Sequence, residues 1–474
     1  MTAPLVVVGD VLLDVDLVGR SERMSPEAPV PVVSDIAERR RPGGAGLASW
    51  LAAQASDRRV VLVAPLADDD AAHEVSDLLT RASGLEILAV PWRGSTPVKT
   101  RIRVGDHPVA RLDSGGATGI VGPLPTRVLE VLAGAAAILV CDYGRGAVAA
   151  GPLREAVATA AATVPVIWDP HPKGSAPVFG CALVTPNEAE LIGMATAAGH
   201  SRMSPASGSD RAGRTNAELT RKMARHWQAR AVSVTQGERG AMLCLGDNVP
   251  LVVSGQRLTA HDTCGAGDSY AAAAALAIAD GCLPSEAVIR AVQAANRFVS
   301  TGGASTVDCD CATPASARAD SGQPLRSRTE NRPGEHSTVV ATGGCFDLLH
   351  AGHIATLQAA RALGDTLVVL LNSDASVRRL KGPDRPLQSE HDRARVLLAL
   401  ECVDDVVIFE EDTPATALRR LQPDVWAKGG DYTGADLPEA AVVAEWSGEA
   451  VIVPYLAGRS TSALVELAAK DPSR

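Results

Sequence analysis

The feature that most constrains this fold is a repeated alternation of short β-branched runs with longer Ala-rich stretches. Short apolar runs are typical of buried strands and the Ala-rich stretches are typical of helices, so the alternation predicts a parallel sheet covered by helices. In the first part of the chain the predicted strands are Val6–Val8, Val60–Val63, Ile138–Cys141, Val164–Trp168, Leu183–Val184 and Ala231–Val234. The predicted fold class is therefore α/β.

A change in composition divides the chain. Residues 313–336 are rich in Pro, Ser, Arg and acidic residues and contain almost nothing that could enter a core, which is typical of a linker. After this segment, the predicted strands Thr338–Thr342 and Thr366–Asn372 restart the alternation. We therefore expect a first α/β domain over residues 1–312, a linker over 313–336 and a smaller α/β domain over 337–474.

Composition excludes several classes of protein. Of the 474 residues, 46% are hydrophobic and 21% charged, which excludes a disordered or fibrous chain. The 45 basic and 55 acidic residues give a net charge of −10, which argues against nucleic acid as a partner. The N-terminus lacks the basic segment of a signal peptide, and no charge-free stretch reaches the roughly 18 residues of a membrane span. We expect a cytoplasmic protein without a membrane partner.

Two further motifs resemble binding sites, but the sequence favours a structural interpretation of each. Cys309 and Cys311 form a C-x-C without a second pair nearby, so ordinary thiols are favoured over a zinc site. The segment GSDRAGRT, residues 208–215, resembles a P-loop but carries Arg214 where the phosphate-binding lysine belongs, and no predicted strand precedes it. We interpret residues 199–214 as a surface insertion.

The strongest chemical signal in the first domain is DTCGAGDSY, residues 262–270, which precedes an Ala-rich run. Gly265, Ala266 and Gly267 are small enough for backbone N–H groups to converge on an anion at a helix N-terminus. Asp268 follows directly, where it can take the proton of a hydroxyl that attacks the bound phosphate. The segment predicts a phosphoryl-transfer site. The alternative is a glycine turn in which Asp268 caps the helix.

The second domain begins with GGCFDLLHAGHIATL, residues 343–357, after a predicted strand. His350 and His353 are three residues apart at a helix start, so both imidazoles face one side, where the helix dipole attracts phosphate. A histidine pair can bind a metal, but no nearby cysteine or third histidine completes such a site. The H-x-G-H motif after a strand is a nucleotidyltransferase signature that does not choose between ATP and CTP.

Two lysines and a hydroxyl-rich segment complete this domain's candidates. Lys381 and Lys428 each stand beside glycine, where they can reach the negative charge that builds up as pyrophosphate leaves; exposed loop lysines are the alternative. The segment RSTSAL, residues 459–464, is either a helix-capping run or a phosphate binder.

The first-domain motifs resemble those of a known family. GAGD, RPGGAG (41–46), NEAE (187–190) and VTQGERG (234–240) resemble the ribokinase-like sugar kinases. Five further segments are similar to the kinase half of the bifunctional heptose 7-phosphate kinase/heptose 1-phosphate adenylyltransferases: GDVLLD (9–14), SPEAPVPVV (25–33), VKTRIR (98–103), RLD (111–113) and CDYGRG (141–146). One difference is Leu47, which stands where the family usually carries an asparagine that hydrogen-bonds the sugar.

For the first domain, the resemblance implies a three-layer ribokinase-like fold with Asp268 as the base. It implies that ATP is bound by Asn187, Glu190, Thr235, Gly237, Gly265, Ala266 and Gly267. Glu190 would organise Mg²⁺, through water. The candidate sugar-binding residues are Asp10, Asp14, Gly43, Gly44, Lys99, Arg101 and Arg111. The basic trio among them is suited to the 7-phosphate, and a solvated face is the alternative.

For the second domain, GGCFDLLHAGH, NSDAS (372–376), RLKG, EEDTP (410–414), KGGDY and RSTS resemble the adenylyltransferase half of the same family. The resemblance implies a Rossmann-like fold in which His350, His353, Lys381 and Lys428 are catalytic. It implies that ATP is bound by Gly344, Phe346, His350, His353, Ser460 and Thr461.

The resemblance implies two reactions of ADP-heptose biosynthesis. ATP phosphorylates the anomeric hydroxyl of D-glycero-D-manno-heptose 7-phosphate, and a second ATP gives its adenylyl group to heptose 1-phosphate, releasing pyrophosphate. A separate phosphatase must remove the 7-phosphate between them. Mg²⁺ is the expected cofactor, while a monovalent cation and a homodimer are left open. The alternatives are another sugar phosphate as substrate, or one half that serves only as a regulatory nucleotide-binding module.

Overall fold

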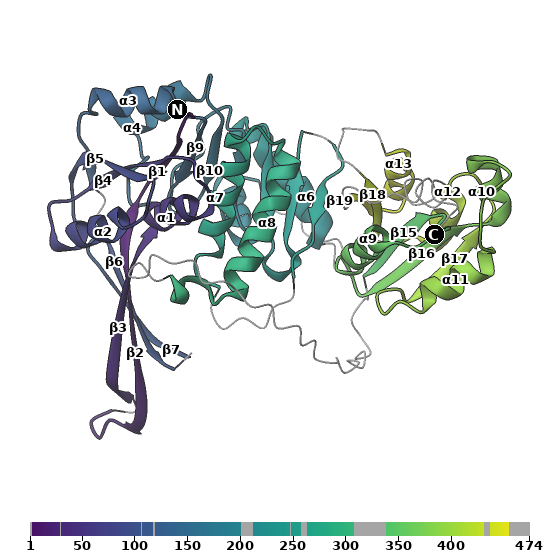
Figure 1. Ribbon diagram of the computed structural model, residues 1–474, viewed down its shortest axis with the longest axis horizontal. Helices are drawn as coiled ribbons and strands as arrows, with labels where there is room; N and C mark the ends of the chain where they lie inside the picture. Colours follow the sequence, from purple (N-terminus) through teal and green to yellow (C-terminus); the bar gives the residue numbers. More distant parts are fainter. Residues whose placement is uncertain are drawn as a thin grey trace, which may run out of the picture. The chain divides into compact units, whose positions relative to one another are not determined.

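The computed structural model describes residues 2–28, 30–105, 107–116, 119–200, 212–246, 248–256, 263–307, 338–430 and 437–454 (Figure 1). The chain forms two compact units. The N-terminal unit comprises Met1–Ser201, Leu219–Gly246 and Gly255–Ala312, and the C-terminal unit comprises Arg202–Glu218, Asp247–Ser254 and Thr313–Arg474. The expected linker over 313–336 lies outside the described residues, as do residues 201–211 of the expected insertion, Cys309 and Cys311.

A parallel sheet forms the centre of the N-terminal unit. Its parallel strands lie in the order β12 (Val232–Thr235), β11 (Leu183–Val184), β10 (Val166–Asp169), β9 (Ala137–Cys141), β1 (Leu5–Gly9), β4 (Val60–Leu66) and β5 (Leu85–Arg93). Two short strands, β13 (Ala241–Cys244) and β8 (Ile120–Val121), pair antiparallel with β12 and β5. All six predicted strands of this unit are confirmed. Most of β1, β4 and β9 is completely buried, as expected for a sheet that is covered on both faces.

Helices flank this sheet (Figure 1). They are α1 (Ala45–Ala55), α2 (Asp70–Thr80), α3 (Thr126–Ala133), α4 (Pro152–Ala160), α5 (Glu188–Ala197), α6 (Ala212–Trp227), α7 (Ala266–Ala279) and α8 (Pro284–Ser300). The part of α6 up to Glu218 is assigned to the C-terminal unit. Helix α7 packs against α1 and α8, and α3 packs against α4. Small side chains line α7, which lets neighbouring backbones approach closely and gives the three-layer arrangement that the alternation predicts.

A second, four-stranded sheet in this unit was not predicted. Its order is β3 (Pro31–Gly44), β2 (Val11–Met24), β6 (Val98–Val104) and β7 (His107–Ser114). Strands β2 and β3 form a long antiparallel ribbon whose far half is exposed (Figure 1). The register places Asp14 opposite both Arg41 and Lys99. This sheet therefore brings charged side chains from three strands together.

The C-terminal unit is a smaller parallel sheet. Its order is β17 (Asp405–Phe409), β16 (Thr366–Asn372), β15 (Val339–Gly344), β18 (Val425–Gly430), β19 (Glu449–Pro454) and β14 (Leu251–Val253). Its helices are α9 (Ala351–Arg361), α10 (Asp374–Lys381), α11 (Glu390–Leu398), α12 (Ala415–Leu421) and α13 (Pro438–Ala444). Strands β15 and β18 are parallel, but the order in which successive strands are added to the sheet reverses between them, so the Rossmann-like order places a ligand crevice at their carboxyl ends.

One strand of this sheet comes from far earlier in the sequence. Leu251 of β14 pairs with Ile452 of β19, and the Ser254 hydroxyl donates to the Ala359 carbonyl. The partly buried Val249 packs against the core around Trp426 and Leu418. Residues 247–254 thus belong to the C-terminal unit, although the sequence predicted them within the first domain. No helix among the described residues is long and apolar enough to span a membrane.

Candidate active sites

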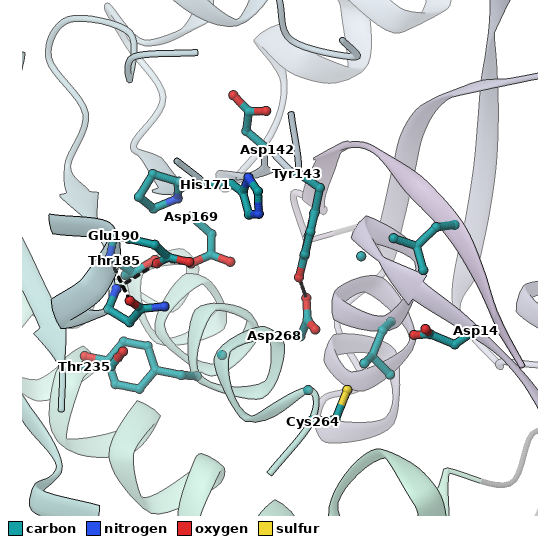
Figure 2. A pocket seen from close by; sticks show the side chains of 18 of the residues that line it. Asp14, Asp142, Tyr143, Asp169, His171, Thr185, Glu190, Thr235, Cys264 and Asp268 are labelled. Atoms are coloured by element: carbon teal, nitrogen blue, oxygen red, sulfur yellow. Dashed lines mark hydrogen bonds between the residues drawn. The ribbon is translucent and has the colours of Figure 1, made fainter. Parts of the chain in front are cut away.

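A cavity of about 230 Å³ lies in the N-terminal unit where β9, β10 and β11 end and α7 begins (Figure 2). Ten of the residues predicted from the sequence line it: Asp14, Gly44, Lys99, Arg101, Asn187, Glu190, Thr235, Gly265, Gly267 and Asp268. Asp10, Gly43, Arg111, Gly237 and Ala266 are not among the lining residues. The structure therefore brings most of the predicted kinase residues to one place.

Helix α7 positions the predicted base. Gly265 has φ of 80° and begins the helix in the left-handed region, where a side chain would also come within 3.0 Å of Leu47 Cδ2. The N–H of Ala266 donates to the Thr263 carbonyl at 3.2 Å, while Gly265 and Gly267 face the cavity. Asp268 lies in the first turn and is only 8% exposed.

The carboxylate of Asp268 is held by a tyrosine. The Tyr143 hydroxyl donates to Asp268 Oδ1 at 2.6 Å (Figure 2). Burial raises the pKa of Asp268 to about 7, although the Tyr143 hydrogen bond opposes this change. The negative charge of Asp14 raises this pKa further, and the positive charge of Lys99 lowers it. A carboxylate with a pKa near neutrality is well matched to accept a proton.

Further carboxylates at the strand ends were not predicted. Asp142 follows β9, and Asp169 is the last residue of β10. Burial raises the pKa of Asp142 to about 6 and that of Asp169 well above its ordinary value, and the charges of Asp268 and Glu190 add to the latter. The Thr185 hydroxyl donates to Asp169 Oδ1 at 2.8 Å. The missed signal was a polar residue directly after four of the predicted parallel strands, at Asp142, Asp169, Thr185 and Thr235.

Asn187 and Glu190 form a capping box at the start of α5. Asn187 Oδ1 accepts from the Glu190 N–H at 2.9 Å, and Glu190 Oε2 accepts from the Asn187 N–H at 2.8 Å. Burial raises the pKa of Glu190. With Asp169, this carboxylate offers the hard oxygen ligands that Mg²⁺ prefers. Among the described residues, no group of three or more His, Cys, Asp or Glu is placed to hold a metal ion.

The predicted sugar-binding residues differ in what they contact. Arg101 donates to Asp14 Oδ1 at 2.6 Å and lies against Cys264. Lys99 is partly buried, which lowers its pKa, and its Nζ lies 5.4 Å from the centre of the Tyr143 ring. Arg111 lies outside the cavity, where its side chain is 54% exposed and forms a two-pronged ion pair with Asp113.

Of the two predicted glycines and Asp10, only Gly44 lines the cavity, and the other two lie behind it. Gly44, with φ of 61°, begins α1, and a Cβ there would lie 2.5 Å from the Asp10 carbonyl oxygen. A Cβ at Gly43 would lie 2.6 Å from Asp14 Oδ2, so glycine is needed beside that carboxylate. Asp10 is 3% exposed, and its carboxylate accepts three backbone N–H groups, from Tyr143, Arg145 and Ala147.

The remaining kinase candidates lie at the end of β12 and just after it. Thr235 lines the cavity, whereas Gly237 begins a short 3-10 helix, Gly237–Arg239, that does not. Leu47 is 2% exposed and lines the cavity beside Gly265, so the difference from the family pattern places an apolar side chain at the site.

The C-terminal unit has a pocket of about 160 Å³ at the carboxyl end of β15 and the start of α9. Gly344, Phe346, His353 and Lys381 line it, as predicted, together with the unpredicted Asp347. The pocket lies beside the position where the strand order reverses, which is where this fold class places its ligand. Ser460 and Thr461 lie outside the described residues.

The two histidines face one side of the helix start, as predicted. Their rings stack with centres 3.9 Å apart, and the Phe346 ring centre lies 5.3 Å from that of His353. His350 caps α9, because its Nδ1 accepts from the Gly352 N–H at 3.1 Å; in the neutral ring, Nε2 therefore carries the proton. Burial lowers the pKa of His353 to about 4, and the charges of His350 and Lys381 lower it further.

The two predicted lysines are in different surroundings. Lys381 lines the pocket at the end of α10. The Lys428 side chain is 39% exposed, and its Nζ lies 3.8 Å from Glu439 and 5.8 Å from the Trp426 ring centre. The structure thus places Lys381 at the pocket and Lys428 beside a competing carboxylate.

A buried arginine that was not predicted holds the loops around this pocket. The Arg393 side chain is completely buried and donates to the carbonyls of Cys345 at 2.6 Å and Asn372 at 2.9 Å, and to the Asp374 carboxylate at 2.7 Å. Asp347 accepts from Arg385 at 2.6 Å. These bonds connect the ends of β15 and β16 to α10 and α11.

Two family models match the chain, one in each unit. Residues 2–309 match the model of the pfkB family carbohydrate kinases, and residues 341–453 match the cytidylyltransferase-like model. The chain is 50% identical over 470 residues to the bifunctional protein HldE of Streptomyces coelicolor, covering 98% of this chain and 97% of that protein. The chain belongs to the HldE family of bifunctional proteins. Identity to the HldE of Azorhizobium caulinodans is 36%, with 98% of each chain covered.

This membership confirms that the protein is a bifunctional carbohydrate kinase and nucleotidyltransferase, with a ribokinase-like and a cytidylyltransferase-like α/β domain. It also confirms the predicted activities, heptose phosphorylation and adenylyl transfer in ADP-heptose synthesis. Among solved structures, an Arabidopsis thaliana ribokinase complexed with ribose and ATP has 21% identity and a TM-score of 0.48, covering 63% of this chain and 93% of that one.

Proposed function

We propose that the N-terminal unit transfers the γ-phosphoryl group of ATP to the anomeric hydroxyl of D-glycero-D-manno-heptose 7-phosphate, with Asp268 as the general base. The observation that carries this proposal is the buried Asp268 carboxylate in the first turn of α7, beside Gly265 and Gly267. Asp268 takes the hydroxyl proton as the sugar oxygen attacks the γ-phosphorus and ADP leaves. The positive end of α7 favours the negative charge of the transferred phosphoryl group.

Both families of ATP-using enzymes generally need Mg²⁺, and the oxygen ligands at this site fit that ion. Asp169 and Glu190 are partly buried carboxylates that line one cavity, and the charge of Glu190 adds to the burial that raises the pKa of Asp169. A divalent cation offsets such repulsion, and Mg²⁺ is usually held by one or two carboxylates together with substrate phosphates. We assign Glu190 the water-mediated role predicted for it and Asp169 a second place near the ion. When bound, Mg²⁺ neutralises charge on the transferring phosphates.

The sugar's 7-phosphate is assigned to the cationic wall of the same cavity. Lys99 and His171 both line the cavity. Burial lowers the pKa of His171, and the charges of Lys99, Lys173 and Arg145 lower it further. Arg101 orients Asp14 by its ion pair, and Arg111 is exposed and paired with Asp113. Lys99 is therefore the best candidate of the predicted trio for direct phosphate contact, and Asp14 is the candidate for a sugar hydroxyl.

For the C-terminal unit we propose that heptose 1-phosphate attacks the α-phosphorus of ATP and pyrophosphate leaves. The sugar phosphate is already an anion, so this step needs positioning and charge neutralisation rather than a base. His350 Nε2–H is a hydrogen-bond donor at the start of α9, where its ring stacks on that of His353. His353 and Lys381 line the pocket, whereas His350 is not among its lining residues. The nucleotide preference for ATP over CTP follows the family.

The two reactions do not join directly. The kinase product carries two phosphates, whereas the transferase takes the 1-phosphate alone, so we propose a separate bisphosphate phosphatase in between. The cytoplasmic location, the homodimer and a monovalent cation stay predictions.

One incubation tests these proposals together. The whole protein is incubated with ATP, Mg²⁺ and a panel of sugar phosphates, and the products are identified by mass spectrometry. We expect a bisphosphate from heptose 7-phosphate and ADP-heptose only from heptose 1-phosphate. Preference for another sugar would contradict the proposed substrate. Formation of ADP-heptose from heptose 7-phosphate and ATP by the purified protein alone would remove the need for a phosphatase.

A further inference from the structure

Tyr143 makes the shortest side-chain contact of the predicted base. Its hydroxyl lies 2.6 Å from Asp268 Oδ1, although the two residues are 125 positions apart in the sequence (Figure 2). Among the described residues, no other hydrogen bond to the Asp268 carboxylate is found. One oxygen of the carboxylate is therefore committed to the phenol, and Oδ2 is left for another hydrogen-bond donor.

The loop that carries Tyr143 is fixed at both ends by buried carboxylates. Asp10 accepts from the N–H of Tyr143 at 2.9 Å and from that of Ala147 at 2.9 Å. Asp142 accepts from the N–H of Gly144 at 2.9 Å and from that of Ser175 at 2.6 Å. Backbone groups held in this way cannot easily shift, so the phenol is presented to Asp268 in one orientation. This explains why Asp10 is buried without lining the cavity.

The ring of Tyr143 is also enclosed. A Cβ at Gly44 would lie 3.4 Å from it, Lys99 Nζ is 5.4 Å from its centre, and the His171 ring centre is 6.2 Å away. Burial and the nearby Asp268 raise the pKa of the Tyr143 phenol well above its ordinary value. The phenol therefore keeps its proton throughout the physiological range and acts as the donor to Asp268.

We propose that Tyr143 is a positioning residue of the kinase reaction, which keeps the Asp268 carboxylate ionised and turns its free oxygen toward the sugar hydroxyl. This inference rests on the proposed role of Asp268 as the base. A hydrogen bond donated to a carboxylate stabilises its ionised form, and here it counters the burial that favours protonation. Removing the phenol hydroxyl should therefore raise the pH at which the base becomes active.

Several other charged or titratable groups also act on Asp268. Asp14 of β2 raises its pKa, and Lys99 of β6 lowers it. Cys141 of β9 and Asp169 of β10 are also close enough to interact with it. None of these groups is changed by removal of the Tyr143 hydroxyl, so a shift of the profile caused by that change reports on the Tyr143–Asp268 bond.

The test is the pH dependence of kinase kcat/KM in the full-length Tyr143→Phe variant. We expect its acid limb to move upward by about one pH unit, so that activity is reduced most at low pH and largely restored at high pH. A uniform loss across all pH values, or an unmoved acid limb, would overturn the proposal, because a merely structural role predicts one of these results.

Tyr270→Phe is the matched control. Tyr270 is also a buried tyrosine of this cavity, but its hydroxyl pairs with the Ser233 hydroxyl at 2.6 Å. Loss of this hydroxyl should leave the acid limb in place. An equal shift in both variants would show a general effect of losing a buried phenol and would overturn the assignment to Tyr143.

Two further measurements keep the outcome clear. Site-specific 3-fluorotyrosine at position 143 preserves the fold and is a stronger hydrogen-bond donor, so the acid limb should move to lower pH. An unmoved limb, or a move to higher pH, contradicts the proposal even if Tyr143→Phe does not fold.

Asp268→Asn separates the hypothesis that Asp268 is the base from the hypothesis that Tyr143 positions it. If that variant retains normal kinase activity, the proposed base is wrong. If it is inactive while the Tyr143 variants leave the profile unmoved, only the positioning role is wrong.

Discussion

The two candidate active sites differ in the number of carboxylates that line them. Five carboxylates face the cavity of the N-terminal unit: Asp14, Asp142, Asp169, Glu190 and Asp268. The pocket of the C-terminal unit is lined by His353 and Lys381, and the carboxylate of Asp347, which also lines it, is paired with Arg385. A neutral sugar hydroxyl needs a base before it can attack phosphorus, whereas a sugar phosphate is already a nucleophilic anion. The difference in lining therefore follows from the difference in nucleophile.

The largest expected effect separates the two units by removing the base. Asp268→Asn keeps the size of the side chain but cannot accept the proton, so kinase kcat should fall by about 10²–10⁴-fold. Adenylyl transfer to heptose 1-phosphate should be unchanged, because Asp268 lies in the other unit. Both activities are measured on the same preparation by quantifying ADP and pyrophosphate. Normal kinase turnover in this variant would show that Asp268 is not the base and that the carboxylates of the N-terminal cavity do not reflect the need for one.

The converse change removes the histidine pair. His350→Ala combined with His353→Ala deletes the stacked imidazoles at the start of α9, and adenylyl transfer should fall by about 10²–10³-fold, as on loss of preorganised donors elsewhere. Bisphosphate formation from heptose 7-phosphate is the internal control for folding. Retention of ADP-heptose synthesis would mean that the histidines serve only to cap the helix.

The pH profiles should sharpen the contrast. Asp268, with a pKa of about 7, must be ionised to act, so kinase kcat/KM should fall about tenfold per unit as the pH drops below that value. His353, with a pKa of about 4, stays neutral over the same range, so adenylyl transfer should lack this limb. The ratio of the two rates, measured on one sample at each pH, is the readout. Parallel profiles would contradict the assignment of a base to one unit only.

The smallest expected effect distinguishes the two predicted lysines of the C-terminal unit. Lys381 lines the pocket, whereas Lys428 is not among its lining residues and forms an ion pair with Glu439. Lys381→Ala should lower adenylyl transfer by about tenfold or more, whereas loss of a partly exposed ion pair in Lys428→Ala should cost no more than about fivefold. Steady-state kinetics with ATP as the varied substrate would show which of the two variants loses more adenylyl-transfer activity. A larger loss at Lys428 would reverse the assignment.

Much of the fold could be predicted because its strands are short, apolar and buried on both faces. The sheet of β2, β3, β6 and β7 was missed because its strands lack that pattern. They carry many charged residues and are partly exposed, since they lie outside the main sheet. Strand β14 was missed because its three residues belong to a sheet whose other strands lie far along the chain.

The sequence by itself determined the helix starts that carry chemistry. At Gly265–Asp268 and at His350–His353, the glycine or capping residue, the dipole and the reactive side chain all lie within a few neighbouring positions. Only the tertiary structure decided which distant groups act on them. Tyr143 meets Asp268, and Asp10 holds the loop of Tyr143 rather than a substrate, because parallel strands bring their carboxyl ends to one edge of the sheet. A local pattern cannot encode those pairings, since the partner residues are more than a hundred positions away and only burial in a shared site makes their hydrogen bonds strong.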